Sequence, residues 1–544
     1  MKRPALVLSD RRSIVSLVAL FVLSIVGLSI VPNAADAAAP TISSFTPTSG
    51  AAGTTVVVTG RGFLGATDVR FDGTSASTFT VKSGSRLTAR VPEGAATGAI
   101  SVETPSGILR SRTDFVVTPI EHVVLILQEN HSFDDVLGKL CAEATSGTVD
   151  RAPCDGATSG TLSDGSSIPL SEAPDVVPDI AHSVESQKEA IDGGAMDGFD
   201  LVRGCRATDD PAYGCLIQFR PSQIPNLAAL ATRFAVSDRT FEFRSTPSWV
   251  GHMIVASATH DGFQGDNPRR STFTTKHGVG WGCDSFKDAR WWNGSQFVLV
   301  PGCIPDQAGQ GPYRESPVPY VPTIFDRLEA AGLPWRIYGG PGFGGTQPAQ
   351  GYGWSICPTF YECLGSAQHN NFVPAQNVIS DAQGGTLPSY SVVTPVGEDS
   401  QHNKWSMAAG DNWIGDVVGA VENGPDWSST AVFITYDDCG CFYDHVPPPQ
   451  PFWGIRLPMV IVSPFAKPGY TDSNNANLLS PMAYLEHTFG LRPLKPGDAS
   501  AYDYADAFDY AQQPVQAVAP VGTHIPRSER RFIEKHPPKA DDPT

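Results

Sequence analysis

The sequence has little charge and no surplus of positive charge. Charged residues make up 17% of the 544 residues, and 38 Lys and Arg against 56 Asp and Glu give a net charge of −18. Without a basic surplus to displace counterions, the composition argues against a nucleic-acid-binding protein. It also opposes long-range attraction to acidic lipid, although a local basic site can still hold a phosphate. With 41% hydrophobic residues the chain is neither disordered nor a coiled coil, and its length allows two to four domains.

No apolar run after the first forty residues is long enough to span a bilayer. Residues 1–39 have a basic start, an apolar run over 14–31 and small residues at the end, which predicts a signal peptide and a secreted or cell-surface protein. The Arg11–Arg12 pair also fits a twin-arginine signal. An ordinary secretion signal and an uncleaved anchor stay open as alternatives.

The ten cysteines include no Cys-x-x-Cys pair, which disfavours a cysteine zinc site. An even number of cysteines in an exported chain suggests disulfides, and we expect pairing between sequence neighbours. The expected pairs are Cys141/Cys154, Cys205/Cys215, Cys283/Cys303, Cys357/Cys363 and Cys439/Cys441.

Residues 40–117 contain no Cys, His or Trp. Short alternating runs such as 54–59 and 86–91 are separated by turns such as Pro47-Thr48-Ser49-Gly50, which predicts a small β-sandwich. With Thr59-Gly60-Arg61-Gly62-Phe63, the segment resembles the immunoglobulin-like IPT/TIG family. Such modules serve as spacers or binding units, so we expect a stalk, with a cell surface or polysaccharide as candidate partner.

From residue 120 the pattern changes to α/β. Short unbroken apolar runs at 123–127, 391–393, 431–435 and 459–462 suit strands buried on both faces of a mainly parallel sheet. Helical segments are predicted at 322–331 and 414–421. The Gly/Pro/Cys-rich stretches 138–180 and 263–320 should be surface insertions, and residues 512–544 an extended tail.

Oxygen-bearing side chains follow two of the expected strands. Glu129 and Asn130 come after the first run, and Asp437 and Asp438 after the third. Ligands of open α/β sheets bind beyond the carboxyl ends of strands, and carboxylate and amide oxygens suit Mg²⁺, Ca²⁺, Mn²⁺ or Zn²⁺. Each residue alone also fits a solvated loop acid or a helix cap.

Ser248 follows Pro247 where a helix can start, so its hydroxyl is a candidate nucleophile in the field of the helix N-terminus. A simple helix cap is the alternative. Histidines near acids or glycines are candidates for proton transfer or phosphate contact. They are His182, His252, His260, His402 and His445.

These motifs together resemble the bacterial phosphoesterase family that contains non-haemolytic phospholipases C and an acid phosphatase. The resemblance covers about 120–495. It rests on Gln128-Glu129-Asn130-His131-Ser132-Phe133-Asp134, Met196-Asp197-Gly198-Phe199, Ser237-Asp238-Arg239, Pro247-Ser248, Tyr436-Asp437-Asp438, Phe442-Tyr443-Asp444-His445 and Gly454-Ile455-Arg456-Leu457-Pro458. It implies an alkaline-phosphatase-like three-layer α/β/α sandwich over 120–511.

The resemblance also implies residue roles. Glu129, Asn130, Asp437 and Asp438 match metal ligands, and Ser248 matches a nucleophile that also contacts the metal. His182 and His402 match histidines that line the phosphate site. Two departures from the family stand out: Val250-Gly251 replaces Pro-Asn, and Gly440-Cys441 replaces Gly-Gly in a loop that a Cys439–Cys441 disulfide would rigidify.

The sequence thus predicts an exported, metal-dependent phosphoric ester hydrolase with a phosphoserine intermediate, of acid phosphatase or phospholipase C type. Its substrate would be a small phosphate ester or a phospholipid head group, the latter with transient membrane contact. Serine at 248 favours the phosphatase. A choline head group would want an aromatic cage, for which the candidates are Trp281, Trp291, Trp292 and Trp413. The alternatives are an inactive exported binding or adhesion protein on the same scaffold and a sulfatase, for which the sequence after Ser248 lacks the usual context.

Overall fold

The structure is a computed structural model that describes residues 39–340 and 355–536. The expected signal peptide therefore lies outside the described residues, apart from its last residue. In the described ranges, no helix is both long and apolar enough to cross a membrane.

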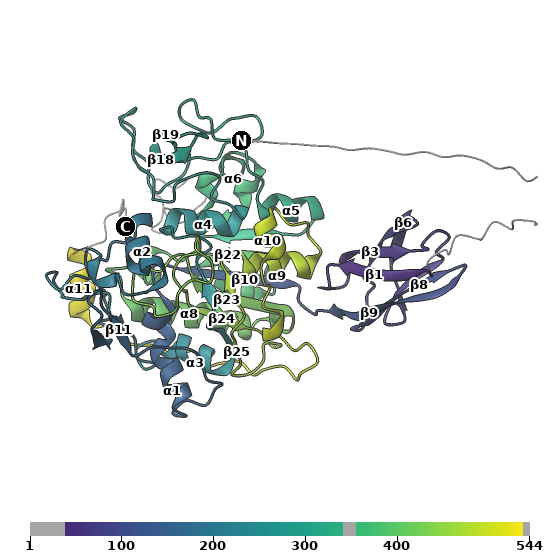
Figure 1. The fold of residues 1–544 in the computed structure, drawn as a ribbon, viewed down its shortest axis with the longest axis horizontal. Coiled ribbons are helices and arrows are strands. Elements are labelled where there is room, and N and C mark those ends of the chain that lie inside the picture. Colours follow the sequence, from purple (N-terminus) through teal and green to yellow (C-terminus); the bar gives the residue numbers. More distant parts are fainter. Residues whose placement is uncertain (1–38, 341–354, 537–544) are drawn as a thin grey trace, which may run out of the picture.

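The N-terminal module, residues 40–117, is a β-sandwich, which confirms the expectation from sequence (Figure 1). In β3, Val56 and Val58 point into the core and Thr55 and Thr59 outward, so the alternation that predicts a half-buried strand also builds the core. One sheet has the order β1 (Thr41–Thr46), β3 (Thr55–Arg61), β7 (Arg86–Arg90), β6 (Thr78–Ser83). The other has the order β2 (Ser49–Gly50), β9 (Gly107–Val117), β8 (Gly98–Thr104), β4 (Asp68–Phe71), β5 (Thr74–Ser75).

The rest of the chain, from residue 120, forms an α/β body around an eight-stranded sheet. The sheet is mainly parallel, as predicted, with β24 as the strand that runs antiparallel to both its neighbours. The order is β21 (Phe372–Val373), β20 (Trp335–Tyr338), β22 (Tyr390–Val393), β10 (His122–Gln128), β23 (Thr430–Tyr436), β24 (Met459–Val462), β15 (Ala235–Ser237), β25 (Thr471–Asp472).

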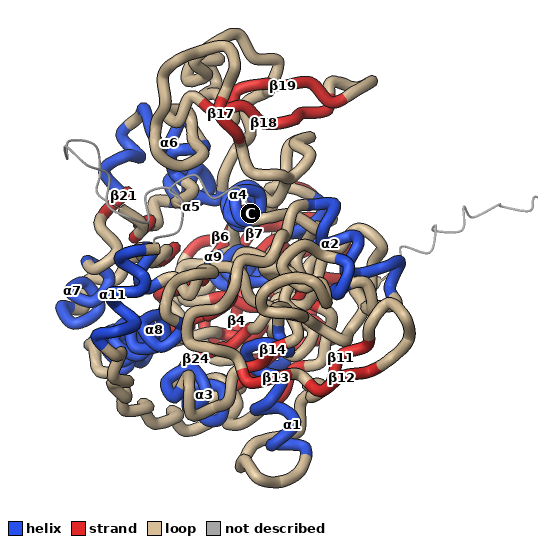
Figure 2. Tube along the Cα trace, turned by 90° about the vertical axis from the view of Figure 1, so that its left-hand side faces the viewer, coloured by secondary structure: helices blue, strands red, loops and turns tan. Residues whose placement is uncertain are grey.

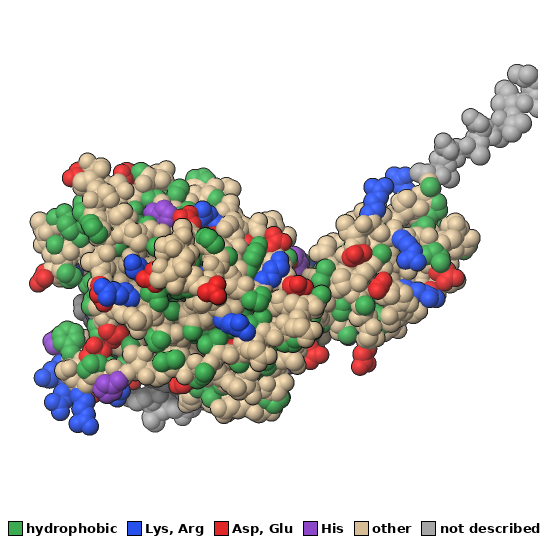
Figure 3. Space-filling view, turned by 90° about the horizontal axis from the view of Figure 1, so that it is seen from below, with side chains coloured by type: hydrophobic (Ala, Val, Ile, Leu, Met, Phe, Trp, Pro, Cys, Tyr) green, Lys and Arg blue, Asp and Glu red, His purple; other side chains and the backbone are tan. Residues whose placement is uncertain are grey.

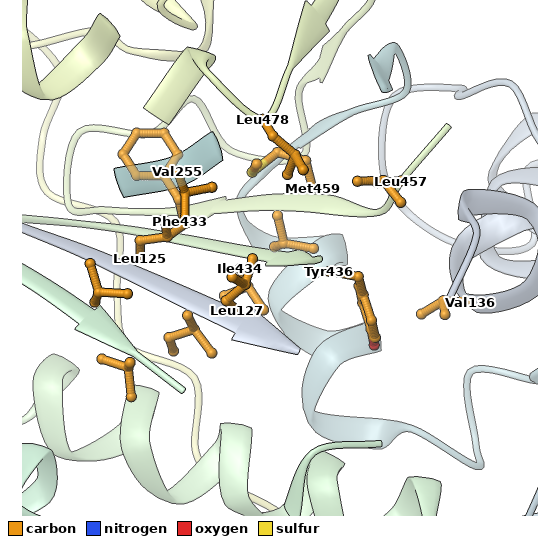
Figure 4. Close-up of a cluster of buried hydrophobic side chains, with 14 of the residues drawn as sticks. Leu125, Leu127, Val136, Val255, Phe433, Ile434, Tyr436, Leu457, Met459 and Leu478 are labelled. Carbon is orange, nitrogen blue, oxygen red and sulfur yellow. The ribbon is translucent and has the colours of Figure 1, made fainter. Parts of the chain in front are cut away.

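Helices cover both faces of this sheet and give three layers (Figures 1 and 2). One layer contains α4 (Ser248–Ser257), α5 (Ile324–Ala331), α9 (Ser480–Phe489) and α10 (Pro496–Ser500). The other contains α3 (Pro225–Arg233), α7 (Asn377–Gly384) and α8 (Met407–Glu422). Figure 4 shows side chains of β10, β23 and β24 packed together, with Val255 of α4 beside them. Burying one such side chain stabilises the fold by roughly 1.5–3 kcal/mol, so the central strands are firmly fixed.

Insertions cover the α/β body. A three-stranded sheet projects beyond α4 (Figure 1) and consists of β17 (Arg269–Arg270), β18 (Lys287–Trp292) and β19 (Phe297–Pro301). The remaining short strands are β11 (Ser159–Thr161), β12 (Ser167–Pro169), β13 (Ser171–Glu172), β14 (Ile217–Gln218), β16 (Thr240–Phe241) and β26 (Ala476–Asn477). The short helices are α1 (Lys139–Thr145), α2 (Val184–Ile191) and α6 (Tyr361–Gly365).

Four of the five expected disulfides are present, joining Cys141 to Cys154, Cys205 to Cys215, Cys283 to Cys303 and Cys357 to Cys363. The prediction of a fifth is wrong, because Cys439 and Cys441 are free and buried. Hydrogen bonds hold this turn instead. The Cys439 amide donates to Glu242 Oε1 at 2.8 Å and the Cys441 amide donates to Cys439 Sγ at 3.1 Å.

The tail differs in part from the extended segment expected for 512–544. Residues 513–526 have no regular secondary structure, but Arg527–Lys535 form α11. Ile533 is buried, whereas the arginines and the lysine of this helix are exposed, which is the amphipathic pattern of a surface helix.

The N-terminal module joins the body through α9. Thr54 Oγ1 and the Ala51 amide both donate to the Thr488 carbonyl, at 3.1 and 3.2 Å. Figure 3 shows the module as a separate lobe beside the larger body. This junction fixes the module to the end of a helix of the body.

Candidate functional site

The ends of two neighbouring parallel strands bring four polar side chains together. Gln128 at the end of β10 is in register with Tyr436 at the end of β23, so the next residues of the two strands run side by side. The Asn130 amide donates to Asp437 Oδ1 at 2.9 Å, and the His131 amide donates to the Asp438 carbonyl at 3.0 Å. We call Glu129, Asn130, Asp437 and Asp438 the strand-end cluster. All four are fully buried.

Asn130 has a left-handed backbone, with φ 64°. Asparagine tolerates this region better than most residues, and such conformations persist where the surroundings hold them. Here the hydrogen bond from its amide to Asp437 does so, and it turns the Asn130 side chain toward α4.

Helix α4 brings the candidate nucleophile to this cluster. Ser248 is its first residue, as the sequence predicts, and its Oγ donates to Asp438 Oδ2 at 3.0 Å. The Asn130 side-chain amide lies 3.2 Å from the same Oγ. The hydroxyl is thus 99% buried, at a helix N-terminus and next to a carboxylate, a setting that favours a negatively charged oxygen only if a cation is near.

A glycine lets α4 come this close. A Cβ on Gly251 would lie 2.4 Å from the Asp437 carbonyl oxygen, well inside contact distance. The Val250-Gly251 pair, a departure from the family pattern, is therefore the point where the helix touches the end of β23.

His252, a candidate from the sequence for proton transfer or phosphate contact, lies against the carboxylates. Its Nε2 is 2.9 Å from Glu129 Oε1 and 3.6 Å from Asp437 Oδ2. The available signal was its spacing: residues four apart in a helix share a face, so Ser248 and His252 point the same way.

Burial dominates the electrostatics of this group. It raises the pKa of Glu129 to about 8 and, together with the charge of Glu129, raises the pKa of Asp437 well above its ordinary value. Burial lowers the pKa of His252. Glu129 Oε2 and Asp437 Oδ2 are buried and have no hydrogen-bond partner within the described residues.

Of the two histidines expected at the phosphate site, one contacts the cluster. His402 Nε2 is 3.0 Å from the Asn130 side-chain oxygen once that amide turns its nitrogen to Asp438 and Ser248. His182 donates from Nδ1 to the Ile180 carbonyl (2.8 Å), and its buried Nε2 has no partner in the described part of the chain. The two segments are neighbours, because the Asn403 side chain donates to the Pro178 carbonyl at 2.9 Å.

A second group of buried acids lies nearby and is charge-balanced. The fully buried Arg456 donates to Asp444 and to Asp134, each at 3.1 Å, and His445 Nδ1 contacts Asp134. We call these four residues the arginine cluster. His445, a candidate from the sequence, therefore belongs to a salt-bridge network.

The other sequence candidates lie apart. His260 is a partly buried loop residue outside both clusters, and burial lowers its pKa to about 4. Of the four tryptophans proposed for a cage, Trp291 and Trp292 are sequence neighbours on β18 and the other two lie elsewhere. Trp291 donates to the Asp261 carbonyl, Trp292 packs edge-on to Phe297 on the projecting sheet, Trp413 lies on α8, and Trp281 is nearly buried.

Comparisons with known proteins agree with the resemblance. Residues 120–492 match the Phosphoesterase family model, and residues 40–117 match the IPT/TIG domain model. The chain is 26% identical to non-specific phospholipase C1 of Arabidopsis thaliana over 68% of this chain and 65% of that protein. It is 25% identical to non-hemolytic phospholipase C of Burkholderia pseudomallei over 70% and 57%. The matched part thus spans about two thirds or less of these relatives. A solved protein of the alkaline phosphatase superfamily from Vibrio parahaemolyticus covers 71% of this chain, with 13% identity and a TM-score of 0.32.

The family model covers well over half of the chain, including both strand ends, α4 and the arginine cluster. The chain therefore belongs to the Phosphoesterase family.

Proposed function

We propose that the chain hydrolyses phosphoric esters through a covalent phosphoserine on Ser248. The observation that carries this proposal is the approach of Ser248 Oγ to Asp438 and Asn130 at the N-terminus of α4. The phospholipase C relatives support an ester of phosphoric acid as substrate.

The residues fit a divalent cation at the strand-end cluster. Glu129 Oε2 and Asp437 Oδ2 are buried there without a hydrogen-bond partner in the described residues. The Ser248 hydroxyl and, in the orientation that accepts from Ser248, the Asn130 amide oxygen complete a set of oxygen donors. Glu129, Asn130, Asp437, Asp438 and Ser248 would hold the ion. When bound, the cation supplies positive charge that lowers the pKa of the serine hydroxyl and offsets charge on the phosphoryl oxygens.

Side chains of the protein supply the nucleophile and the proton transfers. Ser248 Oγ gives its proton to Asp438, to which it already donates a hydrogen bond, and attacks phosphorus in line. The bond from phosphorus to the ester oxygen breaks, and His402 or His182 gives the leaving alcohol its proton. Water then cleaves the phosphoserine and restores the hydroxyl. Support for His402 comes from the other orientation of the Asn130 amide, in which the amide oxygen is 3.0 Å from His402 Nε2 and the amide nitrogen contacts Ser248 Oγ.

The test is Ser248→Ala, assayed with p-nitrophenyl phosphate and p-nitrophenyl phosphorylcholine. We expect turnover of both esters to vanish and acid-quenched wild-type enzyme to carry one phosphoryl group on the peptide of Ser248. Ser257→Ala is the matched control, because Ser257 lies on the same helix and its hydroxyl donates only to carbonyl oxygens of Met253 and Thr259. Normal turnover by Ser248→Ala would refute the assignment.

The ratio of the two wild-type rates tells a phosphatase from a phospholipase C type. If neither ester is hydrolysed with any divalent cation, the chain is instead a binding or adhesion protein on this scaffold. We also propose that the chain is exported, since four disulfides form readily only in an oxidising compartment.

A further inference from the structure

Three buried atoms that could each bind a metal ion lie close together near the N-terminal half of α4. His252 Nε2 from α4, Glu129 Oε1 from the end of β10 and Asp437 Oδ2 from the end of β23 lie within 4.8 Å of one another. The exposed fraction of each side chain is 1% or less. These atoms come from three separate elements, so the fold, and not a local turn, brings them together.

The group has unmet demand for positive charge. The charged side chains acting on the Asp437 carboxyl are Glu129, Asp438 and His252, of which two are acids. Glu129 Oε2 and Asp437 Oδ2 are buried and have no hydrogen-bond partner in the described residues, although His252 Nε2 lies 3.6 Å from Asp437 Oδ2. Buried carboxylates are normally paired or bind metal.

The spacing of the donors suits a single small ion. Donor atoms bound to one ion at about 2.1 Å lie roughly 3 to 4 Å apart, and the His252 nitrogen is 2.9 and 3.6 Å from the two carboxylate oxygens. Imidazole nitrogen is a preferred ligand of Zn²⁺ and Fe²⁺ and is also accepted by Mn²⁺, whereas Ca²⁺ and Mg²⁺ prefer oxygen throughout.

We propose that His252 is a nitrogen ligand of the bound cation and that the site therefore selects a transition-type divalent ion over Ca²⁺ and Mg²⁺. This inference rests on the proposed function in that the strand-end cluster holds a cation. It adds a ligand to the five oxygen donors and narrows the four candidate ions that the sequence leaves open.

The first experiment measures metal binding, not turnover. The full chain is stripped with chelator and titrated by calorimetry with Zn²⁺, Mn²⁺ and Ca²⁺, as wild type, as His252→Gln and as His122→Gln. His122 is the matched control, since it is the first residue of β10, seven residues before Glu129, and contacts the Pro388 carbonyl. For His252→Gln we expect Zn²⁺ and Mn²⁺ affinity to fall at least tenfold and Ca²⁺ affinity to change less than about threefold. An equal change for all three ions, or none, would overturn the proposal.

A second experiment needs no variant and so does not depend on folding of His252→Gln. Pulsed electron paramagnetic resonance on Mn²⁺-loaded wild type detects nitrogen bound to the ion. A nitrogen coupling supports the proposal, and its absence in stoichiometrically loaded protein overturns it. If the ion binds with nitrogen coupling but no ester is hydrolysed, the proposed function is refuted and the ligand assignment stands. If esters are hydrolysed but the bound ion shows no nitrogen coupling, only the ligand assignment is refuted.

Discussion

The strand-end cluster and the arginine cluster are both built from carboxylates that water cannot reach, yet they are balanced in opposite ways. In the arginine cluster, Arg456 lies between Asp134 and Asp444 and His445 contacts Asp134. In the strand-end cluster, Glu129 and Asp437 face each other and Asp438, with His252 as the adjoining base.

This difference separates a structural group from a binding group. Leaving carboxylates buried without a counter-charge costs several kcal/mol, which a fold tolerates where a ligand repays it. Asp134, Asp444 and His445 also bring three possible metal-ligand atoms within 4.8 Å of one another. In the arginine cluster, however, the guanidinium of Arg456 already provides a positive charge between the two acids. We propose that the strand-end cluster binds a cation from solution, which makes it the better candidate for the functional centre.

Removing the arginine should have the largest effect. Arg456→Met leaves Asp134 and Asp444 buried without their cation, and we expect a loss of about 3–5 kcal/mol in the free energy of unfolding or failure to fold. Urea unfolding monitored by circular dichroism measures it, with and without divalent metal. If Arg456→Met lowered the free energy of unfolding by less than about 1 kcal/mol, or if metal fully restored its stability, the arginine cluster would not differ from the strand-end cluster in its source of positive charge.

One Asp-to-Asn substitution in each cluster should change the free energy of unfolding of chelator-treated protein in opposite directions. Asp444→Asn weakens the pairing with Arg456 and should cost about 2–4 kcal/mol. Asp437→Asn removes one of two facing acids, and its oxygen can still accept from the Asn130 and Asp438 amides. We therefore expect it to raise stability by about 1–2 kcal/mol and to abolish stabilisation by metal.

Thermal unfolding of Asp444→Asn and Asp437→Asn, each measured with chelator and with metal, tests these opposite changes in stability. Destabilisation of the stripped protein by Asp437→Asn would argue that the strand-end carboxylates already have a counter-charge.

The proximity of Glu129, Asn130, Asp437 and Asp438 could be predicted from the sequence because its cause is local. An apolar run that ends in acids is visible in the sequence, and two such strands need only be parallel neighbours in register to bring Glu129 beside Asp437. The same argument cannot give the direction of β24, because the run 459–462 is equally apolar in either orientation.

The misses have physical causes too. His252 reaches Glu129 only because Gly251 lets α4 touch Asp437, and this depends on tertiary packing. Cys439 and Cys441 look like a pair by number and spacing, but a turn with two left-handed residues is held by Glu242, which lies almost two hundred residues earlier in the chain. The charged composition of α11 predicts an extended tail, and the buried Ile533 is the one residue in this stretch that indicates an amphipathic helix.

A methyl group at the helix contact should disturb one cluster and spare the other. In Gly251→Ala, the new Cβ meets the Asp437 carbonyl at 2.4 Å, so α4 must shift, at a cost of about 1–3 kcal/mol. Because Ser248 and His252 move with α4, we expect kcat/KM to fall at least tenfold in the p-nitrophenyl phosphate assay. Gly384→Ala in α7, where a Cβ meets nothing closer than 3.8 Å, is the matched control and should keep full activity. Equal activity of the two variants would show that the approach of α4 does not set the site.

The smallest expected effect is a pH dependence confined to the arginine cluster. Burial alone would lower the pKa of His445, but the hydrogen bond and charge of Asp134 outweigh it and raise that pKa. Protonated His445 therefore stabilises the fold below its unfolded pKa near 6.5, and the contribution disappears as pH rises through the folded value. Since the ring is 31% exposed, we expect His445→Gln to cost about 1 kcal/mol or less at pH 5.5 and almost nothing at pH 9. Urea unfolding of both proteins at the two pH values measures this difference. An equal loss at both would assign the contribution of His445 to packing, leaving Arg456 as the sole counter-charge of Asp134 and Asp444.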